Sequence, residues 1–408
     1  MKKQFAAITL VGMGLAGSLC AQSLYDLAPD DTEKDSLPLT WTVGANIGFD
    51  DNPTPFSGQP DDSSFFAQAY LGAAFLTNTP QTTLSVGAQI GVIHYFDNLD
   101  VPGVSVDDTS FTASTYVNWT NRISERLRFV SQNNLAYELE PDFSVGFQSQ
   151  RQNGNFFRWS TDNAIGYRWS ERLATYTGVR FSGIVFDELS NSDRTSVTIY
   201  NDFRYQINDR TVGTLTYRYT DTQGDGVVSD SSNHFILAGL EHRFSPNTSG
   251  TIRAGAQIRE VDGGSSSSSP FIEASFRSQV NSQFSLTGYA RYGVEDFARS
   301  FSDPATGITS VYSDSEALRL GFTANYQVSQ VLGLLAGVNY ANVGYEDLIS
   351  GTGPNSFDED LFNVFVGFNL DLGNNLVFNG RYNFETLDSD IDRDYDRNRF
   401  TLGLQKTF

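Results

Sequence analysis

From residue 40 to the C-terminus, apolar side chains recur at every second position. In TWTVGANIGF (40–49), Trp41, Val43, Ala45, Ile47 and Phe49 alternate with small or polar residues. Successive side chains of a β-strand point to opposite faces, so each such segment has one apolar and one polar face. Beyond the N-terminal leader, no apolar run approaches the roughly 18 to 20 residues that a membrane helix needs. Any insertion into a membrane must therefore use strands that pair into a closed barrel.

Eighteen segments carry this alternation. They lie near residues 40–50, 64–76, 82–95, 109–120, 126–139, 155–169, 172–186, 195–207, 211–220, 233–244, 249–260, 270–280, 283–295, 315–328, 331–342, 360–372, 375–386 and 397–408. Most are long enough for a tilted strand that places about 9 to 11 residues in the hydrocarbon of a bilayer.

The connections alternate between short and long. Two to five residues join alternate pairs of segments, as at 77–81, 170–171, 281–282 and 373–374, and longer acidic stretches such as 50–62, 297–314 and 387–396 fall between them. Short periplasmic turns and long outer loops are typical of bacterial outer-membrane barrels. The sequence therefore predicts an all-β fold: a closed antiparallel transmembrane β-barrel of about 18 strands in the bacterial outer membrane.

The tetrapeptide Ser-Glu-Arg-Leu occurs twice, at 124–127 and at 170–173. Both copies lie between alternating segments, where polar residues make a tight turn and Leu begins the next strand. Trp119 and Trp169 precede the two copies with outward parity, which places them in an aromatic belt at a membrane interface. The repeat thus indicates reused turn chemistry.

The ends of the chain fit secretion and membrane insertion. Residues 1–21 read as a signal peptide, 22–39 as a short acidic periplasmic tail and 40–408 as the barrel. Loss of Lys2 and Lys3 with the signal would take the formal charge from −21 to −23, which argues against a nucleic-acid partner. The terminal Phe408 resembles the signal by which outer-membrane proteins reach the barrel assembly machinery. Lipid and lipopolysaccharide of the outer membrane are the other expected surroundings.

Strand parity assigns side chains to the lumen. The inward positions include fourteen arginines, of which Arg180, Arg291, Arg319 and Arg381 lie near mid-depth and are candidates for an anion-facing wall. The alternative is that these arginines pair with inward carboxylates, notably Asp162, Asp202, Glu241 and Glu273. Three inward tyrosines could instead stack on sugars: Tyr176, Tyr200 and Tyr289. Acidic residues assigned to the outer loops predict a negative mouth: Asp50, Asp51, Asp61, Asp62, Asp107, Asp108, Asp388, Asp390, Asp392, Asp394 and Asp396.

An enzyme is not expected. His94, His234 and His242 have outward parity, so no histidine is offered to the lumen as a base beside a nucleophile. No Cys or His cluster has the spacing of a metal site, and no cofactor motif is present.

The phrase NIGFDDN at 46–52 ends the first strand with Phe49, Asp50, Asp51 and Asn52. With the barrel pattern over residues 40–408, it resembles the outer-membrane porins often called beta-barrel porin 2. The resemblance implies a porin-like diffusion channel for small or saccharide-type solutes, and a link to exopolysaccharide export. The alternative is a non-conducting barrel with a structural or surface-binding role.

Overall fold

The protein is described by a computed structural model over residues 36–53, 63–97, 107–139, 155–187, 193–225, 230–262, 266–295, 300–302, 309–391 and 393–408. Nineteen strands follow one another: β1 (Leu37–Asp50), β2 (Ser64–Asn78), β3 (Thr82–Tyr95), β4 (Thr109–Arg122), β5 (Leu127–Glu138), β6 (Phe156–Arg168), β7 (Leu173–Phe186), β8 (Arg194–Asn208), β9 (Thr211–Gly224), β10 (Ser231–Ser245), β11 (Thr248–Val261), β12 (Ser266–Gln279), β13 (Phe284–Val294), β14 (Ser300–Ser302), β15 (Thr309–Gln327), β16 (Leu332–Ser350), β17 (Phe357–Gly373), β18 (Leu376–Ser389) and β19 (Tyr395–Thr407). Within the described residues, no helix is long and apolar enough to cross a membrane.

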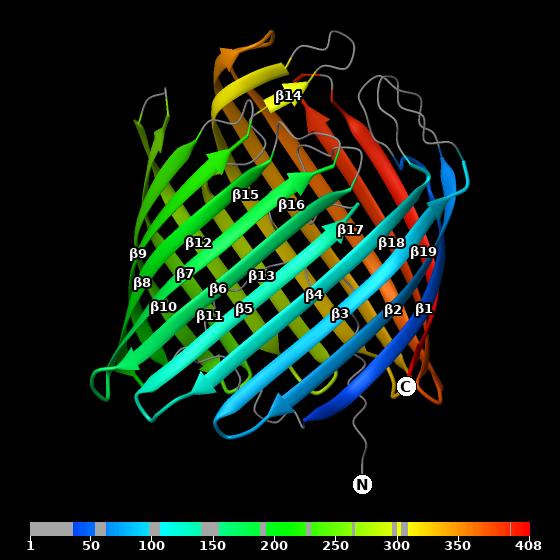
Figure 1. Ribbon diagram of the computed structural model, residues 1–408, viewed down its shortest axis with the longest axis horizontal. Coiled ribbons are helices and arrows are strands. Elements are labelled where there is room, and N and C mark those ends of the chain that lie inside the picture. The colour runs from blue at the N-terminus through cyan, green and yellow to red at the C-terminus, as the bar shows by residue number, and fades with distance from the viewer. Residues whose placement is uncertain are drawn as a thin grey trace.

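The sheet closes on itself. Apart from β14, each strand pairs antiparallel with its neighbours in the ring, and β1 lies beside both β2 and β19 (Figure 1). The β1–β19 register places Thr42 opposite Thr407 and Asp50 opposite Arg399. Among the described residues, the short β14 pairs with β15, while β13 pairs directly with β15. Eighteen strands therefore form the ring, as the sequence predicted.

The outer face is an apolar belt. Large apolar side chains at alternate positions remain exposed around the ring, among them Ile47, Ile90, Phe111 and Ile199, and Phe111 is 70% exposed. A soluble protein rarely leaves a continuous apolar surface open to water, whereas lipid tails cover such a surface. A closed antiparallel barrel with this belt is the architecture of the bacterial outer membrane, and that is where the protein resides.

The repeated turn is held by a serine side chain. Ser124 Oγ accepts hydrogen bonds from the backbone N–H of Arg126 (3.2 Å) and Leu127 (3.0 Å). Ser170 receives the same pair from Arg172 and Leu173. The same geometry recurs at Ser329, and at Asn281 with an amide oxygen in place of the hydroxyl. The interpretation of the repeat as turn chemistry is confirmed.

The two tryptophans near the repeated turns lie as the pattern predicted, and a lysine lies at the same interface. Trp119 and Trp169 face outward, 38% and 59% exposed. Lys406, on the outward face of β19, donates to the backbone oxygen of Asn374 and lies 6.0 Å from the ring centre of Phe408. Its long side chain thus keeps the ammonium at the polar interface.

The strand bounds differ from the sequence prediction at several strands: β9, β12 and β18 run three or four residues further at one end, and β14 lies in a stretch predicted as a loop. β1 begins at Leu37, so the last residues of the predicted acidic tail belong to the barrel, while 1–21 and 22–35 lie outside the described residues. β15, β16 and β17 extend further at their extracellular ends than the alternation indicated. There β16 contains Asp347 with φ 55°, and the β15–β16 register shifts near Val311. These irregularities interrupt the period of two that the prediction relied on.

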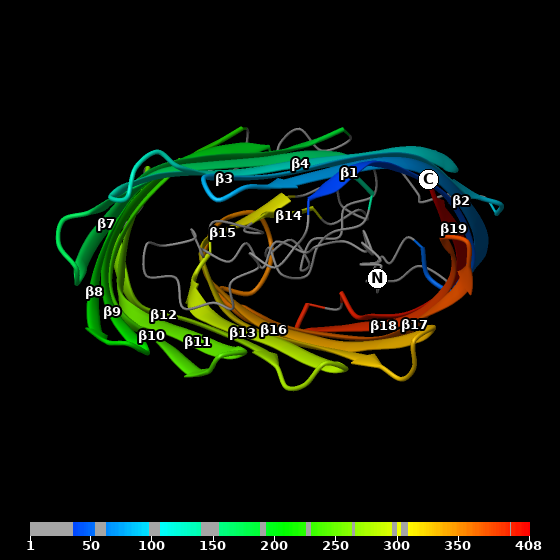
Figure 2. The same ribbon diagram turned by 90° about the horizontal axis from the view of Figure 1, so that it is seen from below.

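The ring is oval in cross-section. Figure 2 shows β3 and β4 along one long side and β11 and β13 along the other, with β7 and β8 at one end. β14 and the adjoining end of β15 lie inside the outline of the ring in this view. The lumen therefore has two facing walls of different strands.

The closing seam between β1 and β19 contains a buried ion pair. Arg397 Nε donates to Asp50 Oδ1 over 2.8 Å, and the two side chains are 3% and 0% exposed. Asp50 is thus part of the seam, and its sequence-based assignment to an outer loop is wrong. The sequence did not predict the position of Asp50 in the seam, because a polar, proline-containing stretch typical of a loop follows it directly.

We expect Asp50→Ala to lower the free energy of unfolding in detergent by about 3 to 5 kcal/mol, because it leaves the Arg397 guanidinium buried without its partner. Guanidinium titration of the purified barrel measures the change. Asp97→Ala, which removes an exposed carboxylate at the end of β3, should change stability by less than about 0.5 kcal/mol. Equal losses for the two variants would show that the pair does not hold the seam.

Candidate functional site in the lumen

One wall of the lumen carries neutral polar side chains. At mid-depth on β1 to β4, the inward positions are occupied by Asn46, Gln68, Tyr70, Gly72, Gln89, Ser114 and Tyr116. Asn46 Nδ2 donates to Gln68 Oε1 over 2.9 Å, and Tyr70 donates to Gln405 Oε1 over 3.1 Å. This wall offers hydroxyl and amide groups to a solute without attracting either sign of charge.

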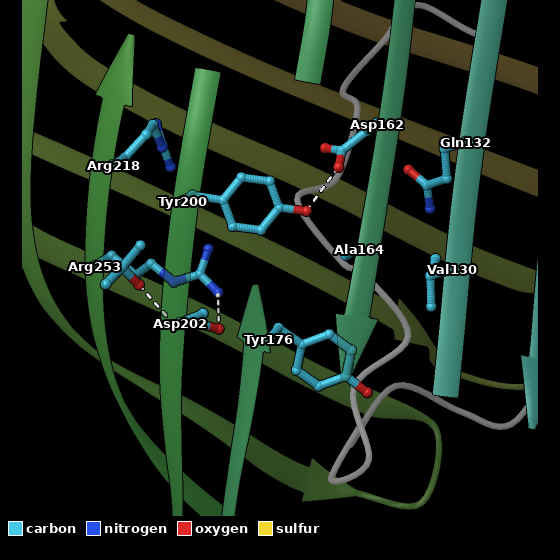
Figure 3. Close-up of a pocket in the computed structure, with 10 residues that line it drawn as sticks. Val130, Gln132, Asp162, Ala164, Tyr176, Tyr200, Asp202, Arg218 and Arg253 are labelled. Carbon is cyan, nitrogen blue, oxygen red and sulfur yellow. Dashed lines mark hydrogen bonds and ion pairs between the residues drawn. The ribbon is translucent and has the colours of Figure 1, made fainter. Parts of the chain in front are cut away.

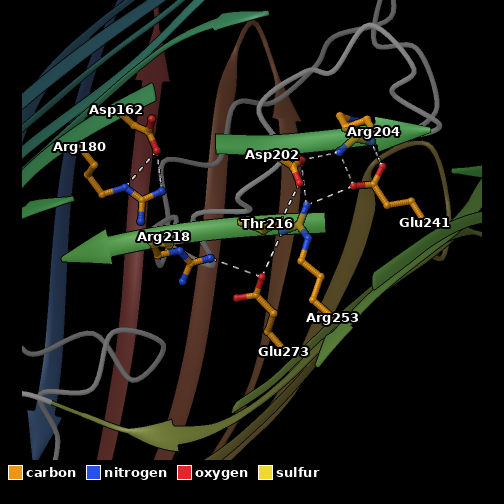
Figure 4. Close-up of polar contacts among 9 residues, drawn as sticks. All are labelled: Asp162, Arg180, Asp202, Arg204, Thr216, Arg218, Glu241, Arg253 and Glu273. Carbon is orange, nitrogen blue, oxygen red and sulfur yellow. Dashed lines mark hydrogen bonds and ion pairs between the residues drawn. The ribbon is translucent and has the colours of Figure 1, made fainter. Parts of the chain in front are cut away.

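The strands from β6 to β12 carry a network of paired charges (Figure 4). Its centre is Arg253, whose guanidinium lies 3.3 Å from Glu241 and 3.1 Å from Glu273. Arg204 pairs with Asp202 over 3.1 Å and donates to Glu241 over 2.8 Å. Thr216 donates to the other oxygen of Asp202 over 2.7 Å.

Two further pairs extend the network. Arg180 donates to Asp162 through Nε (3.0 Å) and Nη2 (2.5 Å), and Arg218 lies 3.6 Å from Glu273. The whole set holds equal numbers of opposite charges: Arg180, Arg204, Arg218 and Arg253 with Asp162, Asp202, Glu241 and Glu273. The charge of this arc is therefore balanced within the wall, and Arg180 lies in an ion pair.

The other three candidate arginines differ from one another. Arg319 donates to Glu295 through Nε (2.9 Å) and Nη2 (2.8 Å), and both side chains are almost fully buried. Glu295 lies just beyond the end of β13; burial alone would raise its pKa, but the adjacent Arg319 guanidinium holds that pKa below its ordinary value. Arg319 is therefore committed to a buried pair.

Arg291 and Arg381 have no such partner. No described carboxylate lies within the 4.0 Å ion-pair distance of either guanidinium. Each lies instead against a phenylalanine ring, Arg291 at 5.6 Å from the centre of Phe271 and Arg381 at 4.4 Å from that of Phe365. These are the two candidate arginines whose charge the described wall does not cancel by direct contact.

The three candidate tyrosines face inward, but two are covered. Tyr176 and Tyr200 are 1% and 8% exposed, and each ring lies against a glycine of the neighbouring strand, Gly166 and Gly178. Tyr200 also donates to Asp162 over 2.6 Å. The prediction that these two rings stack on a sugar is therefore wrong, because their faces are packed in the wall. The ring of Tyr289, half-buried, lies against Gly321 and its hydroxyl donates to Asn339 over 3.3 Å.

A recess opens in the lumen wall between β5 and β11, beside the network of paired charges (Figure 3). Its lining combines aromatic, amide and charged side chains: Val130, Gln132, Asp162, Ala164, Tyr176, Tyr200, Asp202, Thr216, Arg218 and Arg253. All four charged members belong to the balanced network, and Tyr200 donates a hydrogen bond to Asp162 across the recess. The recess is thus part of how the wall is built.

The alternation pattern did not predict several residues that line the lumen. Arg397 has the same parity as Arg399 and could have been found by extending β19 to its start. Arg194 opens β8, Glu295 follows β13, and Asp314 of β15 pairs with Arg259 of β11. The last two have no local signal, since they reach the lumen only where strands end or bend.

The extracellular end is rich in acids, as predicted, though not all of them lie in loops. Asp51, Asp107, Asp108, Asp390 and Asp394 lie outside the strands. Asp388 and Asp396 belong to the outer ends of β18 and β19. The predicted Asp61, Asp62 and Asp392 fall outside the described residues.

The histidines lie on the outer face. His94 pairs with Thr109 (2.7 Å), His234 with Tyr217 (2.9 Å) and His242 with Thr211 (2.9 Å). Over the described ranges, no group of three or more His, Cys, Asp or Glu could hold a metal ion.

No protein-family model and no curated protein matches the chain. Among solved structures, it is similar to Acinetobacter baumannii OccAB4, with 14% identity and a TM-score of 0.48 over 93% of this chain and all of that one. Pseudomonas aeruginosa OpdK, solved with vanillate, gives 14% identity and a TM-score of 0.48 over 91% of this chain and 98% of that one. Pseudomonas aeruginosa OccK2, solved with glucuronate, gives 10% identity and a TM-score of 0.47 over 92% of this chain and all of that one. These similarities are too low to transfer a ligand, and the resemblance to beta-barrel porin 2 stays a prediction.

We expect Gly178→Ala to destabilise the barrel by about 1 to 3 kcal/mol, since the added Cβ would lie 2.4 Å from the Tyr200 ring and would push its hydroxyl away from Asp162. Gly72→Ala is the matched control, because a Cβ at this lumen-facing position would meet its nearest atom at 3.5 Å. Unfolding titrations in detergent compare the two. The packing interpretation fails if both variants are as stable as the parent.

Proposed function

We propose that the protein is a passive diffusion channel for small hydrophilic solutes with a preference for anions. The observation that carries this proposal is the pair of lumen-facing arginines, Arg291 and Arg381, that no described carboxylate neutralises within ion-pair distance. The remaining mid-depth charges are paired, so these two set the sign of the local potential. In a narrow aqueous passage with low-dielectric walls, such a potential raises the local concentration of counter-ions.

Saccharide-type solutes are the finer part of the proposal. The neutral wall of β1 to β4 presents amides and hydroxyls, among them Asn46, Gln68 and Gln89, that can exchange hydrogen bonds with sugar hydroxyls. A solute with both hydroxyls and a carboxylate would use both walls of the oval. The link to exopolysaccharide export rests on the family resemblance.

Planar-bilayer recordings test the anion preference. We expect the parent protein to give discrete conductance steps. Its reversal potential in a salt gradient should indicate a higher permeability to chloride than to potassium. Arg291→Ala and Arg381→Ala should each lower that permeability ratio by about twofold or more at low salt, and the effect should shrink as salt screens the charges.

The control removes a lumen pair without changing the net charge. Arg158→Gln with Glu138→Gln deletes the ion pair between β5 and β6 (2.9 Å) and should leave selectivity unchanged.

Folded protein that shows no conductance steps would favour the alternative, a non-conducting structural or surface-binding barrel. The observation that supports this alternative is that β14 and the adjoining end of β15 lie inside the outline of the ring, where they overlie part of the lumen in this view (Figure 2).

Liposome swelling tests the saccharide part. Gluconate should enter faster than glucose, which is of similar size but neutral, because only gluconate is attracted by Arg291 and Arg381. In the Arg291→Ala/Arg381→Ala variant the two rates should converge, with glucose little changed. A parent channel that admits glucose as fast as gluconate would contradict the preference for acidic sugars.

We also propose that Phe408 is the element that the barrel assembly machinery binds, with lipopolysaccharide and lipid covering the belt. Phe408 exchanges backbone hydrogen bonds with Trp41 across the seam (2.8 and 3.2 Å), while its side chain is 67% exposed. Its ring is therefore accessible even though its backbone is fixed.

A further inference from the structure

The charges of the barrel are divided along its axis. The extracellular ends of the strands are followed or preceded by aspartates, for example Asp97, Asp107, Asp187, Asp193, Asp225 and Asp262. The lumen-facing residues of the periplasmic end include arginines from several strands instead. An anion approaching from the extracellular side therefore meets a repulsive potential, and one approaching from the periplasm meets an attractive one.

Three of these arginines lie on consecutive strands. Arg122, the last residue of β4, stands directly opposite Arg128 of β5. Arg128 stands opposite Gly166 of β6, and Arg168 lies two residues further along that strand on the same face. Like charges directly opposite on a sheet are destabilising. The chain thus places several cations together on the lumen wall near the periplasmic opening.

A second group lies across β10 to β12. Ser249 of β11 has Arg243 as its partner on β10 and Arg277 as its partner on β12, and all three positions face the lumen. The side chain of Arg277 is exposed. The arginines of β4 to β6 and those of β10 and β12 lie on different parts of the ring. Together they can contact several anionic groups of one solute at the same time.

Three of the lumen arginines at this end, Arg122, Arg168 and Arg277, differ from the paired arginines at mid-depth. No described carboxylate lies within ion-pair distance of Arg122, Arg168 or Arg277. The turns nearby are locally balanced, since Glu125, Glu171 and Asp209 each stand next to an arginine in the chain. Arg122, Arg168 and Arg277 therefore contribute positive charge from the lumen wall itself, where Asp371 at the periplasmic end of β17 is an exposed carboxylate on the same face.

We propose that the periplasmic end of the lumen is a binding vestibule for carboxylate-bearing oligosaccharides, and that such solutes enter the channel faster from the periplasm than from outside. The inference rests on the proposed channel function and adds that the solute carries several carboxylates and that it enters from the periplasmic side. Arginine suits this solute because its planar group can donate two parallel hydrogen bonds to a carboxylate. A chain with a carboxylate on each sugar gains from both arginine groups, whereas a small anion gains from one.

The test is single-channel recording with the protein inserted in a known orientation. Oligogalacturonate is the probe, added to one side at a time at low salt, and the measured quantity is the rate of transient current blocks. We expect the block rate from the periplasmic side to exceed that from the extracellular side by about tenfold and to fall as salt is raised. A neutral malto-oligosaccharide of the same length should show no such difference between sides.

A triple variant and a matched control locate the effect. Arg122→Gln/Arg168→Gln/Arg277→Gln removes three charges from the lumen wall and should abolish most of the excess periplasmic block rate. Arg126→Gln/Arg172→Gln/Arg210→Gln removes three charges from exposed periplasmic turns and should retain it. Migration of unheated samples in detergent gels checks that both variants are folded, and the comparison of sides in the parent protein needs no variant.

Equal block rates from the two sides of a conducting parent channel would overturn the vestibule while leaving the channel proposal intact. An equal loss in both triple variants would also overturn it, since the charge of the whole rim would then be responsible. Folded protein without any conductance would remove both proposals together.

Discussion

The structure depends on one constraint: a strand in a lipid bilayer must find hydrogen-bond partners for its backbone on both edges. The β1–β19 seam meets it, since residues 42–50 pair with 399–407 and leave no open edge among the strands of the ring. The Asp50–Arg397 pair and the backbone bonds between Trp41 and Phe408 fix the two ends of this seam. Lipid on one side and water on the other then follow for every strand, because closure gives the sheet an outside and an inside.

Closure also decides where charges can lie. The outer belt excludes them, so the arginines of the strands gather on the inner face, at a density that requires compensation. From β6 to β12 the compensation is local, through carboxylates such as Asp202, Glu241 and Glu273. Where no described carboxylate reaches ion-pair distance, as at Arg291 and Arg381, the wall retains a positive charge that a solute can sense. Structure and selectivity thus use the same residue type, and the neighbours determine which role it has.

The sequence predicted the fold well because alternation and turn chemistry are local. Period two identified eighteen strands, and the spacing of short turns identified the side on which the chain turns back. The candidate site was less predictable. Parity placed Arg180 and Arg319 on the inner face, but only the register between strands shows that Asp162 and Glu295 lie beside them. Tyr176 and Tyr200 also face inward, yet their burial depends on glycines in neighbouring strands, which no single-strand pattern reveals. Asp50 was misplaced because the end of a strand cannot be distinguished from the start of a loop by composition.

The turns at Ser124, Ser170 and Ser329 are each capped by a group inside the same hairpin. Such a turn needs nothing from the rest of the ring to close. Each of these three hairpins is therefore a two-strand unit whose turn is closed by its own residues. Closure of the ring, in which the first and final strands meet, has to wait for the whole polypeptide.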